Sequence, residues 1–259
     1  MTKENKLTSQ KFWDEYWSSR LEKKPSRRIG IIAQELHHIF DTYLPADPSL
    51  SILEIGGAPG EYLLYIVKKH GYQAHSMDYS SVGNEKTREM FRSHGVEVTL
   101  HEQDLFNVLD KSLQFDIVYS LGFIEHFDDV DNVIEKHLEL LKPGGILLLG
   151  VPNLTGIYHL FLKRLSPSHD QTHNLKTMNT KNWIAFEDKF KLKTIFKGYI
   201  GGFEPLIMKK LDISNALNKF LLFWVKVMMV VFSLRKTFLR RINSRFWSGY
   251  IVGIYSKPR

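Results

Sequence analysis

Apolar stretches of strand length alternate with segments of helical periodicity along most of this chain. The first such stretch, Ser51–Ile55, is followed by apolar positions near 3.6-residue spacing over Glu61–His70, and then by a second strand over Gln73–Met77. Alternation of this kind is typical of βαβ units, in which helices connect parallel strands. The pattern therefore predicts an α/β domain built on a mostly parallel sheet.

The same alternation continues to the end of the chain and predicts seven strands in all. Phe115–Tyr119 is apolar after Asp116, as expected for a strand buried on both faces. A helix over Val130–Leu141 is predicted to end at Lys142-Pro143-Gly144-Gly145, which is a strong breaker. The other expected strands are Val96–His101, Ile146–Val151, Leu192–Tyr199 and Tyr250–Ser256, and the other expected helices are Asn84–His94 and Thr180–Phe190.

Two segments lie outside this alternation. Residues 1–45 are predicted to form an N-terminal helical cap, with helical character from about residue 9 to residue 44. The main domain is then expected to span residues 46–259. Within it, a long hydrophobic segment at about 204–248 is predicted to be a helical insert before the last strand.

A glycine-rich turn follows the first strand at Gly56–Gly60. Glycine lets the backbone turn sharply and approach a ligand closely, and in α/β sheets such a turn lies at the edge where ligands bind. Alone, the turn is equally compatible with a purely structural role. The G-x-G-x-x-G and Gly-Lys-Ser/Thr patterns of phosphate-binding loops are absent, and Pro59 lacks a backbone donor. The turn therefore favours a nucleoside without phosphates.

Two aspartates follow the next two strands. Asp78 lies about 20 residues beyond the glycine turn, where a carboxylate can accept hydrogen bonds from ribose hydroxyls. Asp104 follows the third strand and can accept from an adenine amino group. Isolated aspartates are more often turn or cap residues. Three such features in order, each at a strand end, together indicate a nucleoside site.

These residues resemble the class I S-adenosylmethionine-dependent methyltransferases. Glu54–Gly60 is similar to their first motif, and Phe115–Phe127 to their fourth strand and the loop after it. The resemblance implies a Rossmann-like seven-stranded sheet, mostly parallel with an antiparallel last strand, and S-adenosylmethionine as cofactor. The cofactor-binding residues that it implies are Glu54, Gly56, Gly57, Gly60, Asp78, Tyr79, Asp104, Leu105, Ser120 and Leu121.

Four shorter motifs resemble the bacterial ubiquinone-type, sugar and natural-product methyltransferases: Ile124–Phe127, Val151–Asn153, His173-Asn174 and Gly201–Phe203. This resemblance implies a small-molecule acceptor. Nucleic acid is disfavoured because the fourth strand is not followed by the Asp/Asn-Pro-Pro-aromatic run of base methyltransferases. The chain also lacks the cysteine nucleophile that methylation of cytosine carbon requires.

Three histidines are candidate general bases for a hydroxyl acceptor. His126 follows the fourth strand, where the acceptor is expected, although it is equally suited to support the cofactor loop. His173 and, more weakly, His169 lie in the loop after the fifth strand. Trp13, Tyr16 and Trp17 could fold over the cofactor as a lid, but their spacing also fits an amphipathic helix packed on the domain, which is the plainer interpretation.

Composition narrows the alternatives. The chain of 259 residues has no cysteine, which excludes disulfides and thiolate metal sites, and no metal site is expected. No apolar signal-peptide core is visible in residues 1–28, so we expect a cytoplasmic protein. The net charge is +7. Basic residues recur from Lys209 to Arg259, where Asp212 is the only acidic residue. This charge suggests either a surface contact or a solvated basic face.

The hydrophobic segment Ala216–Leu234, with basic residues on both flanks, leaves several alternatives open. It approaches the length of a membrane-spanning helix but carries Lys219 and Lys226, and a single crossing would separate the last strand from the sheet. We favour a pocket cap or homodimer surface; the alternatives are a peripheral contact of residues 216–241 at the inner face of the membrane and a segment that is simply part of the core. The functional alternatives are a non-catalytic cofactor-binding partner subunit and a membrane-associated enzyme acting on a lipid-linked substrate.

Overall fold

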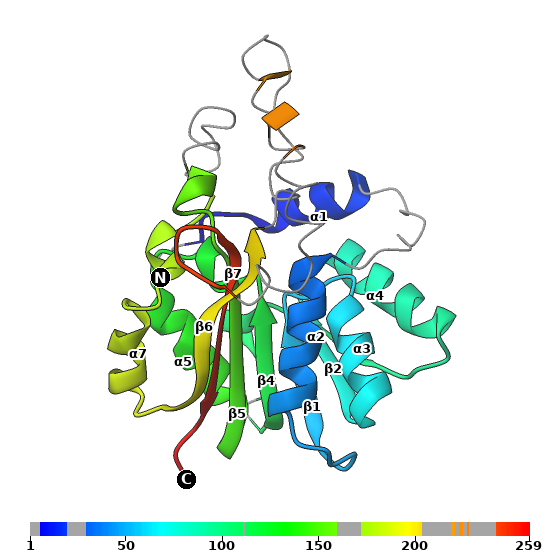
Figure 1. Ribbon diagram of the computed structural model, residues 1–259. Helices are drawn as coiled ribbons and strands as arrows, with labels where there is room; N and C mark the ends of the chain where they lie inside the picture. Colours follow the sequence, from blue (N-terminus) through cyan, green and yellow to red (C-terminus); the bar gives the residue numbers. More distant parts are fainter. Residues whose placement is uncertain are drawn as a thin grey trace.

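The computed structural model describes residues 6–19, 30–110, 112–159, 172–203, 219–220, 223–224, 227 and 242–259. These residues form a seven-stranded sheet in the order β3-β2-β1-β4-β5-β7-β6, and β7 is antiparallel to both of its neighbours (Figure 1). The predicted fold class is therefore confirmed. The strands are β1 (Ser51–Ile55), β2 (Gln73–Asp78), β3 (Thr99–Glu102), β4 (Phe115–Leu121), β5 (Leu141–Pro152), β6 (Lys193–Phe203) and β7 (Ser248–Ser256).

Helices cover both faces of the sheet because successive strand residues point to opposite sides. On β1, Ile52 packs against one layer of helices and Leu53 against the other. The first layer contains α2 (Ile31–Tyr43), α3 (Glu61–His70) and α4 (Ser81–Ser93), and the second contains α5 (Val130–Glu139) and α7 (Trp183–Lys189). A further helix, α1 (Gln10–Ser19), lies beyond the carboxyl ends of the parallel strands (Figure 1).

The predicted bounds of β1 and α3 are confirmed, and the helix predicted over Val130–Leu141 ends at Glu139, before the predicted breaker. The prediction of a turn at 142–145 before the fifth strand is wrong. Residues 142–145 belong to β5, which begins at Leu141 and pairs there with Phe115. A register shift between Phe115 and Ile117 accommodates this part of β5. Gly145 allows the close approach, because a Cβ there would lie 2.8 Å from the Asp116 carbonyl oxygen. The third strand begins at Thr99 instead of Val96.

The segment before β1 contributes to the core of the sheet domain. Leu36, Ile39 and Phe40 of α2 are buried in the cluster that covers one face of the sheet. The division into a cap at 1–45 and a domain at 46–259 stays a prediction. Most of the predicted insert at 204–248 lies outside the described residues. Among those that are described, no helix combines the length and apolar character needed to cross a bilayer.

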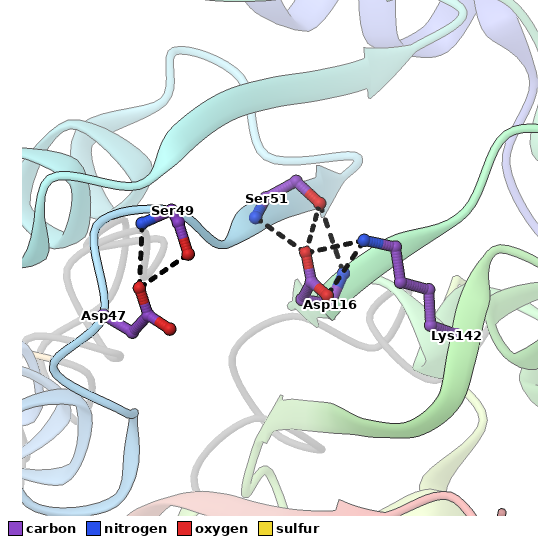
Figure 2. Close-up of polar contacts among 5 residues, drawn as sticks. All are labelled: Asp47, Ser49, Ser51, Asp116 and Lys142. Carbon is purple, nitrogen blue, oxygen red and sulfur yellow. Dashed lines mark hydrogen bonds and ion pairs between the residues drawn. The ribbon is translucent and has the colours of Figure 1, made fainter.

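A polar network joins β1 to β4 at their amino ends. The Asp116 carboxylate accepts hydrogen bonds from the backbone N–H of Ser51 at 2.9 Å and from its hydroxyl at 2.8 Å, and Lys142 Nζ lies 2.9 Å from both carboxylate oxygens (Figure 2). Nearby, Ser49 donates to Asp47. This network fixes the two central strands at the end opposite the glycine turn.

Candidate active site

The turn after β1 requires glycine for two separate reasons. Gly56 and Gly60 adopt φ angles of 65° and 82°, in the left-handed region that side chains disfavour. In addition, a Cβ on Gly56 would lie 2.3 Å from the ring of Phe123, which follows β4. The backbone N–H of Gly56 donates to the Met77 carbonyl at 2.8 Å. The turn is thereby fixed between the ends of β2 and β4.

Asp78 ends β2 and is 8% exposed. Burial raises the pKa of its carboxyl to about 6, although backbone N–H groups of Ser80, Ala58 and Tyr79 oppose the rise. The Ser80 N–H donates to Oδ1 at 2.9 Å, and Asn84 Nδ2 donates to the Asp78 carbonyl oxygen at 2.9 Å. A carboxylate held in this way can still accept hydrogen bonds from a ligand hydroxyl group, as the sequence predicts.

A cavity lies between this turn, the ends of β2 and β4, and the helix α1. Trp13 and Trp17 of α1 line it together with Met77 and Phe123, and α1 also packs against α4, so the lid and the packed-helix interpretations both stay predictions. Tyr16 is not among the lining residues. The lining residues are Lys6, Thr8, Trp13, Trp17, Ile55, Gly56, Met77, Asp78, Tyr79, Gln103, Asp104, Leu105, Gly122, Phe123, His126 and Phe127.

The N-terminal segment is tied to the cavity by polar contacts. Lys6 forms an ion pair with Asp104, the residue predicted to contact adenine. The Leu7 N–H donates to the His126 carbonyl at 2.9 Å, and Gln10 Nε2 donates to the Tyr79 carbonyl at 2.6 Å. Segment 6–19 therefore covers the cavity in the structure, and the Asp104 carboxylate is paired with this cover.

Half of the predicted cofactor residues line this cavity and half do not. Ser120 is fully buried and forms a hydrogen bond with His137 instead of facing the cavity. Nδ1 of His137 lies 2.8 Å from the Val133 carbonyl and therefore carries the proton. Nε2 of His137 accepts from the Ser120 hydroxyl at 3.0 Å. Burial lowers the pKa of His137 to about 4. The residues lining the cavity are Gly56, Asp78, Tyr79, Asp104 and Leu105, whereas Glu54, Gly57, Gly60, Ser120 and Leu121 lie outside it.

The structure brings the two leading histidine candidates together. His126 is 8% exposed and lines the cavity, and its ring centroid lies 4.8 Å from that of His173 and 5.2 Å from that of Trp13. His126 Nδ1 lies 2.8 Å from the Thr172 carbonyl oxygen. The third candidate, His169, lies outside the described residues.

The sequence predictions missed several residues of this cavity. Lys6 and Thr8 come from the start of the chain, and no motif marks them. Gly122 and Phe123 replace the predicted Ser120 and Leu121 as lining residues, which moves the contact two residues along the loop after β4. A signal for this shift exists in the sequence, because a glycine after a buried strand marks the point where backbone can approach a ligand.

Comparison with known proteins identifies the family of this chain. Residues 26–203 match the family model described as a methyltransferase domain. The chain is 31% identical over 106 residues to the ubiquinone biosynthesis O-methyltransferase of Chelativorans sp. (strain BNC1), which covers 41% of this chain and 42% of the relative. The chain thus aligns with less than half of the length of this curated relative.

Solved structures show the same fold at lower identity. A putative sarcosine dimethylglycine methyltransferase from Galdieria sulphuraria has a TM-score of 0.60 at 12% identity, covering 96% of this chain and 98% of that one. The [4+2]-cyclase SpnF has a TM-score of 0.61 at 14% identity, covering 91% and 86%. At these identities the likeness concerns the fold alone.

The matched region spans well over half of the chain. This protein belongs to the methyltransferase domain family. The predicted class and its cofactor, S-adenosylmethionine, are confirmed. The buried Asp78 carboxylate and Gly56 both line the cavity, and both suit such a cofactor.

Proposed function

We propose that this protein transfers a methyl group from S-adenosylmethionine to a hydroxyl of a small acceptor that is partly apolar or contains a sugar. The bound cofactor would supply an electrophilic methyl group on its sulfonium sulfur. Asp78 would hold the ribose, and Gly56 would let the backbone approach it. Trp13 and Trp17 would exclude water from the cavity.

The position and the tautomer of His126 are the observations that support a hydroxyl acceptor. Because the Thr172 carbonyl can only accept, Nδ1 of His126 carries the proton in the neutral imidazole, and Nε2 carries the lone pair. A neutral histidine at the wall of the cofactor cavity is suited to take the proton from an acceptor hydroxyl. His173, in ring contact with His126, is proposed as the second residue of this acceptor side.

The test is methyl transfer from labelled S-adenosylmethionine to parallel panels of phenols, sugars and amines. We expect a hydroxyl acceptor, and His126→Asn should lower kcat by about 100-fold or more while binding of S-adenosylhomocysteine changes little. His94→Asn, at an exposed histidine after α4, is the control. Preference for amines would contradict the hydroxyl assignment, and so would an undiminished rate in His126→Asn.

Two alternatives are separated by the same assays. Saturable cofactor binding without transfer to any acceptor would favour a non-catalytic partner subunit. Segment 216–241 lies largely outside the described residues, but Phe220, Phe223 and Trp224 are exposed there by 56%, 58% and 51%. These aromatic side chains support a peripheral contact with a membrane or a second copy of the chain. Flotation of the protein with anionic vesicles tests the membrane contact.

A further inference from the structure

Three side chains beside the cavity place metal-ligating atoms close together. One nitrogen each from His126 and His173 and one oxygen from Glu125 lie within 4.8 Å of one another. Glu125 and His126 belong to the short helix Ile124–His126 after β4, whereas His173 follows β5. The Asn174 N–H donates to the Glu125 carbonyl at 2.6 Å, which joins these two segments directly.

Glu125 lacks the partner that a buried carboxylate needs. It is 1% exposed, and its Oε2 has no hydrogen-bond partner among the described residues. Its Oε1 lies 4.0 Å from Nε2 of His126, which is beyond hydrogen-bond distance. Since buried polar groups are normally hydrogen-bonded or coordinate a metal, this oxygen lacks a partner that a bound cation would supply.

The two histidines are oriented as metal ligands commonly are. A ligating histidine usually places its second ring nitrogen against a carbonyl, carboxylate or similar group, which fixes the ring and its tautomer. Here Nδ1 of His126 lies 2.8 Å from the Thr172 carbonyl, and Nδ1 of His173 lies 2.9 Å from the Thr172 hydroxyl. The lone pair of His126 is therefore on Nε2, the nitrogen nearer to Glu125.

We propose that Glu125, His126 and His173 bind a divalent first-row transition metal ion such as Zn²⁺. Two imidazoles and one carboxylate are the donor set of catalytic zinc and non-haem iron sites, whereas Mg²⁺ and Ca²⁺ prefer oxygen ligands. Zinc bonds of about 2.1 Å in a tetrahedral arrangement place ligand atoms about 3.4 Å apart. The cluster would therefore contract by about 1 Å on binding. The sequence analysis predicts no metal site, and these three ligands come from segments that are separate along the chain.

The location suggests what the ion would do. His126 lines the cofactor cavity, so an open coordination position on the ion would lie at the acceptor side. In the metal-bound protein the ion would bind the acceptor oxygen and promote loss of its proton to solvent, which is the task that the proposed function gives to His126 in the metal-free protein. This role rests on the proposed methyl transfer, but binding of the ion does not.

Cobalt is the probe, because Co²⁺ occupies zinc sites and its visible absorption reports the coordination geometry. Untagged, cofactor-free protein would be titrated with Co²⁺, and bound metal would be counted by equilibrium dialysis. We expect one ion per chain and a tetrahedral spectrum that Zn²⁺ abolishes. Glu125→Gln and His173→Asn should each weaken Co²⁺ binding by roughly 100-fold, since loss of an outer-shell partner alone costs 10–100-fold.

Two controls keep the result specific. His75→Asn tests the other close pair of histidines, because Nδ1 of His75 lies 3.2 Å from Nε2 of His101 between β2 and β3. His94→Asn tests an exposed histidine. Both variants should bind Co²⁺ like the parent, and all variants should retain binding of S-adenosylhomocysteine as evidence of folding.

The proposal is overturned if the parent binds no Co²⁺, if His173→Asn binds it unchanged, or if His75→Asn alone abolishes binding. Failure of metal binding with intact binding of S-adenosylhomocysteine rejects the metal site and leaves the proposed function standing. The converse result, Co²⁺ bound at this cluster without any cofactor binding, rejects the proposed function and leaves the metal site.

Discussion

Buried carboxylates at the two ends of the central strands β1 and β4 differ in how completely they are hydrogen-bonded and paired. At the amino ends, Asp116 accepts from the Ser51 backbone and hydroxyl and pairs with Lys142 (Figure 2). At the carboxyl ends, Glu54 and Glu125 are each 1% exposed, and each has an oxygen without a hydrogen-bond partner among the described residues.

The pKa values of these carboxyl groups differ in the same way. At Asp116, burial alone would raise the pKa, but hydrogen bonds from Ser51 and the charge of Lys142 hold it below its ordinary value. At Glu54, burial raises the pKa to about 8. One end of the strands is thus arranged for stability. The other end keeps polar groups poorly compensated, as is frequent where a ligand completes the site.

The largest effect on stability and cofactor binding is expected from adding a side chain where the glycine turn contacts Phe123. Gly56→Ala adds a side chain at positive φ and against the Phe123 ring, and should cost about 2–4 kcal/mol of unfolding free energy and abolish binding of S-adenosylhomocysteine. Gly95→Ala is the matched control, because Gly95 also has positive φ but a Cβ there meets nothing within 4 Å.

Gly95→Ala should cost only about 1–2 kcal/mol and leave cofactor binding intact. Chemical denaturation and calorimetry measure the two quantities. Equal losses in both variants would mean that backbone conformation alone, and not the contact with Phe123, governs the turn.

The next effect concerns the pH dependence of stability in the absence of cofactor. The carboxyl group of Glu54 would lose its proton near pH 4.5 in the unfolded chain but near pH 8 in the folded protein. Within that window the unfolded state binds fewer protons, so the free energy of unfolding falls as pH rises. Glu54→Gln should remove the share of this fall that Glu54 causes, while the shares of Glu125 and Asp78, whose pKa values are also raised, remain. The variant should be stabilised relative to the parent at pH 8, on the order of a few kcal/mol.

Denaturant unfolding between pH 5 and about pH 8.5 measures the slope. A slope unchanged in Glu54→Gln would show that this carboxylate is not the source of the pH dependence.

The smallest effect is expected at the amino ends of the strands. Asp116→Asn keeps the shape of the side chain but removes the charge that pairs with the partly exposed Lys142, and should cost about 1 kcal/mol at neutral pH. Because the folded pKa of Asp116 is lowered, its contribution is present at neutral pH and is lost as the pH falls through that lowered value. The difference between parent and variant should therefore vanish in acid. A difference that grows in acid would contradict this account.

Local sequence patterns were sufficient to predict most of the sheet, because strands buried on both faces are continuously apolar and amphipathic helices have apolar residues at helical spacing. Leu53 and Ile55 mark β1 unambiguously, and the glycine turn and Asp78 follow it closely in sequence. The predicted start of β5 at Ile146 was wrong, because pairing of Leu141 with Phe115 extends the strand through residues 142–145, whose sequence resembles a breaker.

The rest of the site depends on contacts between distant segments, which no local pattern encodes. Lys6 meets Asp104, and Glu125 meets His173, only after the chain has folded. His126 could be proposed from its place after β4, but its tautomer depends on the Thr172 carbonyl, which lies 46 residues further along the chain.

The most direct test of the account is the binding of S-adenosylhomocysteine, measured by calorimetry for the parent, Asp78→Ala and Asp116→Asn. Saturable binding is expected for the parent and for Asp116→Asn. A loss on the order of 100-fold is expected in Asp78→Ala, since hydrogen bonds to a charged group are worth about 1.5–3 kcal/mol. Absence of binding by well-folded parent protein, or equal affinity in Asp78→Ala, would contradict the assignment of the cofactor site.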